Sequence, residues 1–192
     1  MTPLILTISG GPRKDGCSAR LLRCFTAGWQ AAFIHYDAYE CRFAPCSDCR
    51  FCREHEGCAI DDMDGFFADF ERADGIVFAS PVYNMSFPAP MKAVIDRMQR
   101  YYSARFFLGQ RPPIARFRPA ALLLSAGSHD EDGSIVASQL RKIFTVTNCE
   151  LTCSVIVNNT DRGGCVADKE NEIRSAAALF AASVDLITNS SQ

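Results

Sequence analysis

The chain lacks the features that would assign it to a membrane, secreted or nucleic-acid-binding class. No apolar run among its 192 residues approaches the ~18 residues that a membrane-spanning helix needs. The N-terminus is apolar first and basic afterwards, which is the reverse of a secretory signal. The formal net charge of −2 gives no overall attraction to nucleic acid or to an anionic membrane. We therefore expect a cytoplasmic protein that binds neither.

Internal repeats, low-complexity tracts and long linkers are also missing, so we predict a single domain over residues 1–192. The sequence shows no Ser/His/Asp order and no paired carboxylates that would indicate a hydrolase, and we assign no side chain as an obligatory acid or base. The chain has ten Cys among 192 residues, about 5%, which is less than the roughly 8–10% that marks a disulfide scaffold. In a reducing compartment, clustered Cys indicate metal or redox chemistry more readily than disulfides.

Strand-like and helix-like segments alternate along the chain. Apolar runs typical of buried strands cover residues 4–9, 33–39, 75–80, 120–125 and 151–157. Helical spacing of apolar residues follows at 18–30, 61–72, 90–101, 134–146 and 167–187. This alternation predicts a flavodoxin-like three-layer α/β sandwich with a five-stranded parallel sheet of order 2-1-3-4-5. Ligands of such sheets bind where the order reverses, which selects the loops after Ser9 and Ser80.

The first selected loop is rich in glycine and opens a helix. Glycines allow backbone N–H groups to turn toward an anion, and a helix N-terminus adds positive charge. The alternative interpretation is a solvated turn with an ordinary helix cap. The loop has neither a Walker A ending nor a G-x-G-x-x-G pattern, and the phosphate of a mononucleotide fits it better. The candidate ligand-binding residues are Ser9, Gly11, Pro12, Arg13, Gly16, Cys17 and Ser18.

The second selected loop follows the most apolar strand and precedes a helix that begins with prolines. Its aromatic ring and its backbone N–H groups are suited to a flat heterocycle at the strand ends; alternatively its side chains only cover the edge of the sheet. Its candidate residues are Ser80, Pro81, Val82, Tyr83, Asn84, Met85 and Ser86. Gly127 and Ser128 follow the fourth strand on the same edge and are further candidates.

Both loops resemble those of the NAD(P)H-dependent FMN reductases, over residues 4–100. The strings that carry the resemblance are Gly11-Pro12-Arg13-Lys14-Asp15-Gly16-Cys17-Ser18, Ser80-Pro81-Val82-Tyr83, Met91-Lys92 and Ile95-Asp96-Arg97. The resemblance implies that the first loop holds the phosphate of FMN, that the second packs on the isoalloxazine ring, and that NAD(P)H is the electron donor. It also implies a homodimer or homotetramer. Gly11 stands where the family usually has Ser, and Cys17 where it usually has Asn, which leaves phosphate binding to backbone amides, Ser9, Arg13 and Ser18.

Four Cys form a compact cluster in the loop at residues 45–60. Cys46, Cys49, Cys52 and Cys58 have the spacing C-x2-C-x2-C-x5-C, which suits a site of four thiolates. The spacing is similar to that of the iron–sulfur flavoproteins, which implies a [4Fe–4S] cluster near FMN. Zinc also takes four Cys ligands, and a metal-free or oxidised loop is the third interpretation.

Taken together, the sequence predicts an FMN-dependent oxidoreductase with NAD(P)H as donor and a small redox acceptor or an electron-carrier protein as partner. The cluster, where present, would relay single electrons between FMN and that carrier. The alternative is a non-catalytic flavin electron carrier or flavin-binding module whose Cys loop holds structural zinc or no metal.

Overall fold

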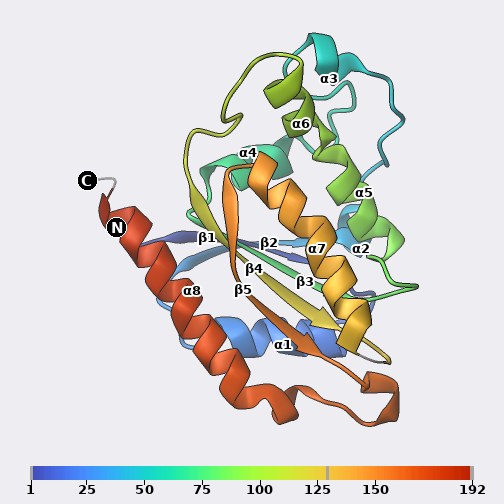
Figure 1. Cartoon of the computed structure of the whole chain (residues 1–192), viewed down its shortest axis with the longest axis vertical. Coiled ribbons are helices and arrows are strands. Elements are labelled where there is room, and N and C mark those ends of the chain that lie inside the picture. Colours follow the sequence, from blue (N-terminus) through green and yellow to red (C-terminus); the bar gives the residue numbers. More distant parts are fainter. Residues whose placement is uncertain (1, 129, 191–192) are drawn as a thin grey trace.

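The computed structural model (Figure 1) describes residues 2–128 and 130–190, with residues 130–132 and 190 described only as backbone. One parallel sheet has the order β2-β1-β3-β4-β5, which confirms the predicted flavodoxin-like α/β topology. Its strands are β1 (Leu4–Ser9), β2 (Ala32–Asp37), β3 (Gly75–Pro81), β4 (Arg118–Ser125) and β5 (Cys149–Val157).

Helices cover both faces of the sheet (Figure 1). The sheet separates the hydrophobic core into two clusters, one under each layer of helices. One face carries α1 (Cys17–Thr26) and α8 (Glu170–Ser190). The other carries α4 (Asp64–Arg72), α5 (Ala89–Arg97), α6 (Gln99–Phe106) and α7 (Asp130–Val146). Shorter helical turns are α2 (Ala38–Cys41), α3 (Phe51–Glu54), η1 (Thr160–Arg162) and η2 (Val166–Lys169).

The apolar run of β3 shows why a parallel strand needs no polar face. Successive side chains of a strand point to opposite faces of the sheet. Ile76 and Phe78 accordingly pack in the core under α4, α5 and α7, whereas Val77 and Ala79 pack in the core under α1 and α8. Both faces are buried, so the four positions from Ile76 to Ala79 are all apolar. None of the helices in the described ranges combines the length and apolar character needed to cross a bilayer.

Several predicted elements end differently from expectation; the helix predicted over 18–30, for example, ends at Thr26. Two others differ for a local reason that the contacts show. The strand predicted over residues 33–39 ends at Asp37, because the Asp37 carboxylate accepts hydrogen bonds from Tyr39 N and Glu40 N (2.9 and 3.3 Å) and so begins α2. The helix predicted over 90–101 is two helices, α5 and α6, that meet at Met98. Met98 N there shares its hydrogen bond between Val94 O and Ile95 O (3.3 and 3.1 Å), which tightens the turn.

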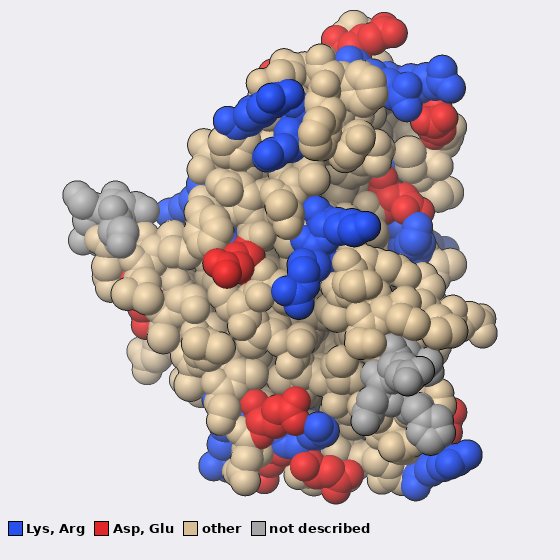
Figure 2. All heavy atoms as spheres, viewed as in Figure 1, with Lys and Arg blue, Asp and Glu red and all other residues tan. Residues whose placement is uncertain are grey.

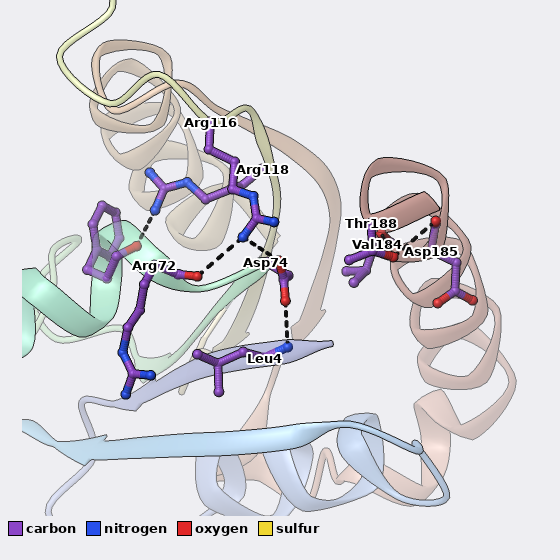
Figure 3. Close-up of polar contacts among 9 residues, drawn as sticks. Leu4, Arg72, Asp74, Arg116, Arg118, Val184, Asp185 and Thr188 are labelled. Carbon is purple, nitrogen blue, oxygen red and sulfur yellow. Dashed lines mark hydrogen bonds and ion pairs between the residues drawn. The ribbon is translucent and has the colours of Figure 1, made fainter. Parts of the chain in front are cut away.

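The amino ends of three strands are tied together by the carboxylate of Asp74, just before β3 (Figure 3). Asp74 accepts a hydrogen bond from Leu4 N at the start of β1 (2.7 Å) and pairs with the Arg116 guanidinium ahead of β4 (2.5 Å). Arg116 also donates to Arg72 O (3.4 Å). Asp74 is only 8% exposed, so removing its carboxylate leaves the partly buried Leu4 N–H without an acceptor and the exposed Arg116 side chain without its ion pair.

We expect Asp74→Ala to lower the free energy of unfolding by about 1–3 kcal/mol, the cost of leaving the partly buried Leu4 N–H without its acceptor. Urea denaturation followed by circular dichroism measures it. The matched control is Asp185→Ala on the exposed face of α8 (Figure 3), which should change the free energy of unfolding by no more than about 0.5 kcal/mol. Equal effects of the two substitutions would contradict the role of Asp74.

Candidate functional site

A crevice of about 430 Å³ lies at the carboxyl edge of the sheet, where the order of the strands reverses. The register places the last residues of the central strands level with one another: Ser9 is paired with Ala79, and Pro81 with Ser125. The two loops selected from the sequence therefore meet across this crevice. A volume of this size is in the ordinary range for small-molecule and cofactor sites. Its lining includes Gly11, Pro12, Arg13, Gly16, Cys17, Ser18, Pro81, Val82, Tyr83 and Gly127.

The N-terminus of α1 borders this crevice without a side-chain cap. The helix begins at Cys17, and its N-cap residue Gly16 has no side chain to satisfy the first backbone N–H groups. Arg13 and Arg20 also line the crevice, and within the described residues their guanidinium groups form no hydrogen bond or ion pair. Free amides, the helix dipole and two uncommitted cations together form a site for an anion such as a phosphate.

Gly11 allows the first loop to approach both the helix and the second loop. A Cβ atom at this position would come within 2.8 Å of Ser18 Oγ and 3.4 Å of Pro81 Cδ. The space that a serine side chain would need is therefore taken by the Ser18 hydroxyl. This contact gives a physical reason for glycine at a position where the family usually has serine.

The second loop is a tight turn that its own backbone closes. Tyr83 N donates to Ser86 O (2.9 Å) and Ser86 N to Tyr83 O (3.0 Å), with Asn84 and Met85 at positive φ (49° and 58°). Two successive residues of this kind define a type I′ turn. Val82 N donates to Ser125 O (2.8 Å). The expected donation from this loop to a flavin ring is thus wrong for the amides of Val82 and Tyr83, since both already have partners.

Some predicted site residues lie outside the lining of the crevice. Ser80 is fully buried, and its hydroxyl donates to Pro81 O (2.9 Å). Asn84, Met85 and Ser86 occupy the tip of the turn beyond Tyr83, and Ser128 is exposed next to Gly127. Their assignment as cofactor-binding residues stays a prediction.

Ser9 faces a second hollow of about 420 Å³, between α1 and the edge strand β2. Its hydroxyl lies 3.4 Å from Nε2 of His35, and Thr7 Oγ1 lies 2.9 Å from Nδ1 of the same ring. Burial lowers the pKa of His35, in opposition to the carboxylates of Asp37 and Glu40, which raise it. Gly11, Arg13 and Ser18 line both hollows, so the first loop forms the wall between them.

A third wall of the crevice comes from the segment after β5, which the sequence analysis missed. Thr160 N donates to Ala126 O (3.1 Å) and Asp161 N to Gly127 O (3.4 Å), so the segment is fastened to the loop after β4. A Cβ atom at Gly127 would collide with the Asp161 carboxylate. The rule that ligands bind at carboxyl ends of strands applies to β5 as well and was the available signal. The crevice residues of this wall are Thr160, Asp161, Gly164, Cys165 and Val166.

Cys17 and Cys165 line the crevice from different segments. Burial raises the pKa of the Cys17 thiol, the neighbouring Cys165 adds to the rise, and the Arg20 guanidinium opposes it. Burial is the largest of these effects on the Cys17 pKa. The protonated thiol is favoured, and we assign Cys17 no nucleophilic role.

The four clustered Cys line one small hollow of about 70 Å³ at the end of the molecule formed by α3 and α6 (Figure 1). All four are free thiols. The loop turns through left-handed backbone at Asp48 and Arg50 (φ 51° and 64°). In residues 2–128 and 130–190, no three Cys, His, Asp or Glu side chains are close enough together to hold a metal ion. The side chains that share the hollow with Cys46, Cys49, Cys52 and Cys58 include Arg50, Arg53, Arg97 and Arg100.

Figure 2 shows that positive and negative side chains are interspersed on the face that it draws. At the α3–α6 end, three aromatic side chains are 43–51% exposed: Tyr102, Phe106 and Phe107. Phe117, directly before β4, is 45% exposed.

Comparison with known proteins finds a matching family and several related flavoproteins. The pattern of the NADPH-dependent FMN reductase family matches residues 3–159. An iron-sulfur flavoprotein of Methanosarcina thermophila is 38% identical over 99 residues, which are 48% of this chain and 51% of that protein. One from Archaeoglobus fulgidus is 33% identical over 118 residues, 56% of this chain and 57% of that protein. These matches span about half the length of the curated relatives.

Solved structures resemble the fold over nearly the whole chain. The NAD(P)H:quinone oxidoreductase from Methanothermobacter marburgensis has a TM-score of 0.69 at 22% identity, over 92% of this chain and 95% of that one. An FMN-dependent NADH-azoreductase from Bacillus anthracis, solved in complex with FMN, has a TM-score of 0.68 at 14% identity, over 93% and 99%. At such identities the likeness shows the fold alone. The family match, by contrast, covers most of the chain, and the chain therefore belongs to the NADPH-dependent FMN reductase family.

Proposed function

We propose that the chain is an FMN-dependent oxidoreductase that receives electrons from NAD(P)H and passes them to a small redox acceptor or an electron-carrier protein. The observation that carries the proposal is the uncapped N-terminus of α1, flanked by two uncommitted arginines, at a crevice whose opposite wall is Pro81–Tyr83. The family supports FMN as the cofactor. The residues present fit it, because the uncapped backbone N–H groups of α1 and the side chains of Arg13 and Arg20 border one crevice and can receive a phosphate.

The first loop would hold the phosphate of FMN. The backbone N–H groups of the first turn of α1 have no partner in the helix and would donate to the phosphate oxygens. Arg13 and Arg20 would add charge-assisted hydrogen bonds. The Asp161 carboxylate on the third wall is an acceptor suited to hydroxyl groups of the sugar-like chain that follows the phosphate.

The second loop would hold the ring system in place. The side chains of Pro81 and Tyr83 offer flat surfaces at the crevice, and Tyr83 is 43% exposed, so its ring is accessible for stacking. The two hydrogen bonds that close the turn make it a rigid support. FMN, when bound, supplies the chemistry by accepting a hydride or single electrons and passing them on.

The cysteine loop would hold a second redox centre. The four Cys line one hollow, and four thiolates are a donor set that both a [4Fe–4S] cluster and zinc accept. In the described part of the chain, however, no three possible ligands are close enough together to hold a metal ion, so the loop would have to draw its thiols together on binding one. The iron-sulfur flavoproteins among the relatives favour the cluster, which would exchange single electrons with FMN. A homodimer or homotetramer remains part of the proposal, with the exposed aromatic residues of the α3–α6 end as the expected contact.

We expect Arg13→Ala and Arg20→Ala each to weaken FMN binding about tenfold, because each removes one charge-assisted contact to the phosphate. Quenching of flavin fluorescence on titration measures the affinity. Riboflavin, which lacks the phosphate, should bind both variants as it binds the unaltered chain. The matched control is Arg23→Ala, since Arg23 lies on α1 outside the crevice and donates to Lys14 O. Equal losses for FMN and riboflavin would contradict the placement of the phosphate.

Bound FMN should also protect Cys17 and Cys165 from alkylation, because both thiols line the crevice. Iodoacetamide labelling with and without FMN, followed by peptide mass spectrometry, measures the protection. Cys24 is exposed on α1 outside the crevice and should be labelled equally in both samples. Labelling of Cys17 that FMN does not slow would indicate that the cofactor binds elsewhere.

Anaerobic purification and stopped-flow mixing with NADH or NADPH test the oxidoreductase itself. A flavin absorption band that bleaches on mixing supports the proposed reaction, and iron with a broad absorption shoulder beside that band supports the cluster. A flavin that stays oxidised with both nucleotides would make the chain a carrier rather than a reductase. A colourless chain that takes up no added FMN would refute the proposal altogether.

A further inference from the structure

The helix α8 is apolar on its outer face as well as on the face that packs against the sheet. Its inner side chains are buried in the core and include Ile173, Phe180 and Val184. On the outer face, Leu179 and Leu186 are 54% and 70% exposed, the two highest values among the exposed large hydrophobic residues that the structure describes. Figure 1 shows α8 along the outside of the molecule. A helix that is apolar all round is usually buried, so the outer face of α8 is suited to contact with another molecule.

The outer face of α8 carries one continuous stripe without charge. Its members are all exposed, and they follow one another at intervals of four, three and four residues, which places them in line along the helix: Ser175, Leu179, Ala182 and Leu186. In residues 175–190 the only charged side chain is Asp185. Alternating intervals of three and four residues are typical of the seam between two packed helices, and a solvated helix face would carry more charge.

A lipid surface is a poor match for this stripe. Helices that lie on membranes carry Lys and Arg beside their apolar face, where these residues meet anionic headgroups. Residues 175–190 contain neither Lys nor Arg. The sequence of the stripe therefore favours a protein surface, and above all another helix, as the occupant.

The stripe is complementary to itself when a second copy of α8 runs in the opposite direction. A two-fold axis midway between Leu179 and Ala182 sets Leu179 of one copy against Ala182 of the other, and Leu186 against Ser175. Each large side chain then meets a small one, which allows the two helices to interdigitate closely. A parallel arrangement would instead set leucine against leucine and leave gaps between the small residues.

The charged residues beside the stripe fit the same antiparallel arrangement. Arg174 and Asp185 are eleven residues apart, about three helical turns, so they lie on the same flank of the stripe. The two-fold axis keeps the flank and reverses the direction, which brings Arg174 of each copy toward Asp185 of the other. In the single chain Arg174 pairs with Glu170 on its own helix (2.5 Å), and both side chains are exposed. Two packed copies would thus gain a pair of opposite charges at each end of the contact.

We infer that the outer face of α8 is a self-association surface, at which two copies of the chain pack antiparallel about a two-fold axis between Leu179 and Ala182. The inference does not rest on the proposed function, since none of the described residues of α8 lines the crevice. The contact is also separate from the α3–α6 end, where the proposed function expects an oligomer contact. A chain with both contacts assembles as a tetramer, and a chain with the α8 contact alone forms a dimer.

Sedimentation velocity of the full chain tests the contact, with Leu179→Glu and Leu186→Glu as the variants. Each variant places a carboxylate in the stripe, where the second copy would bury it without a partner. We expect each to raise the dissociation constant of the contact about 100-fold, which halves the mass of the assembly at working concentrations. The FMN affinity should not change. Ile135→Glu is the matched control, because Ile135 is an apolar residue of α7 that is also exposed (38%), and it should leave the mass unaltered.

Charge reversal and cross-linking test the direction of the helices without placing a charge in the stripe. Arg174→Glu and Asp185→Arg should each raise the dissociation constant about tenfold, because each puts like charges together at both ends of the contact, and the double variant should restore it. A mixture of Ser175→Cys and Leu186→Cys chains is oxidised with copper phenanthroline and digested without reduction. Mass spectrometry should then find a disulfide that joins position 175 of one copy to position 186 of the other.

An unaltered chain that is monomeric at about 100 µM overturns the inference, because a specific contact should be populated at such a concentration. An assembly whose mass neither leucine variant changes overturns it as well. So does a double charge variant as weak as the single ones, or a disulfide that joins position 175 to position 175. A chain that associates through α8 but binds no FMN supports the inference and refutes the proposed function, so the two can fail separately.

Discussion

The unsatisfied amide groups at the first turn of α1 are the feature on which the rest of the site depends. They exist because residue 16 is glycine and supplies no capping side chain, and because β1 delivers the chain to the carboxyl edge of the sheet directly before the helix begins. The neighbouring Arg13 and Arg20 also line the crevice, and within the described residues their side chains form no ion pair. A site of this kind attracts an anion by geometry and dipole together, and the parallel topology brings the second loop across from it.

The crevice proposed for FMN and the hollow lined by the four clustered Cys lie at separate places in the structure. The crevice is assembled at the edge of the sheet from segments far apart in the sequence, with the loop after β5 as its third wall. The cysteine hollow lies instead between the loop at residues 46–59 and the side chains of Arg97, Arg100 and Ser103 from α5 and α6. Hydrogen bonds of Arg97 and Asp62 hold the ends of that loop together (Figure 1 draws α3 at the far end of the long axis). A substitution in one place should therefore leave the other folded, which makes flavin binding a sound control for the cysteine loop.

The sequence predicted the sheet because its signals there are local. The apolar runs of β1, β3 and β4 are bounded by Gly or Pro, and a buried parallel strand admits little else. The place of the first loop, at the edge of the sheet and directly before a helix, was also predicted, since glycine and a helix start are readable without a structure. The break at Met98 and the early end of β2 were not predicted, because they arise from a shared hydrogen bond and from the Asp37 cap. Nor was Asp161, which meets Gly127 only after the sheet has formed.

A crystal structure of the chain with FMN tests the central claim most directly, because the first loop forms a wall of two hollows and only one of them can hold the phosphate. The account predicts the phosphate at the backbone amides that begin α1, between Arg13 and Arg20, with the ring system against Pro81 and Tyr83. A phosphate in the hollow beside His35, or a ring system away from the second loop, would contradict it.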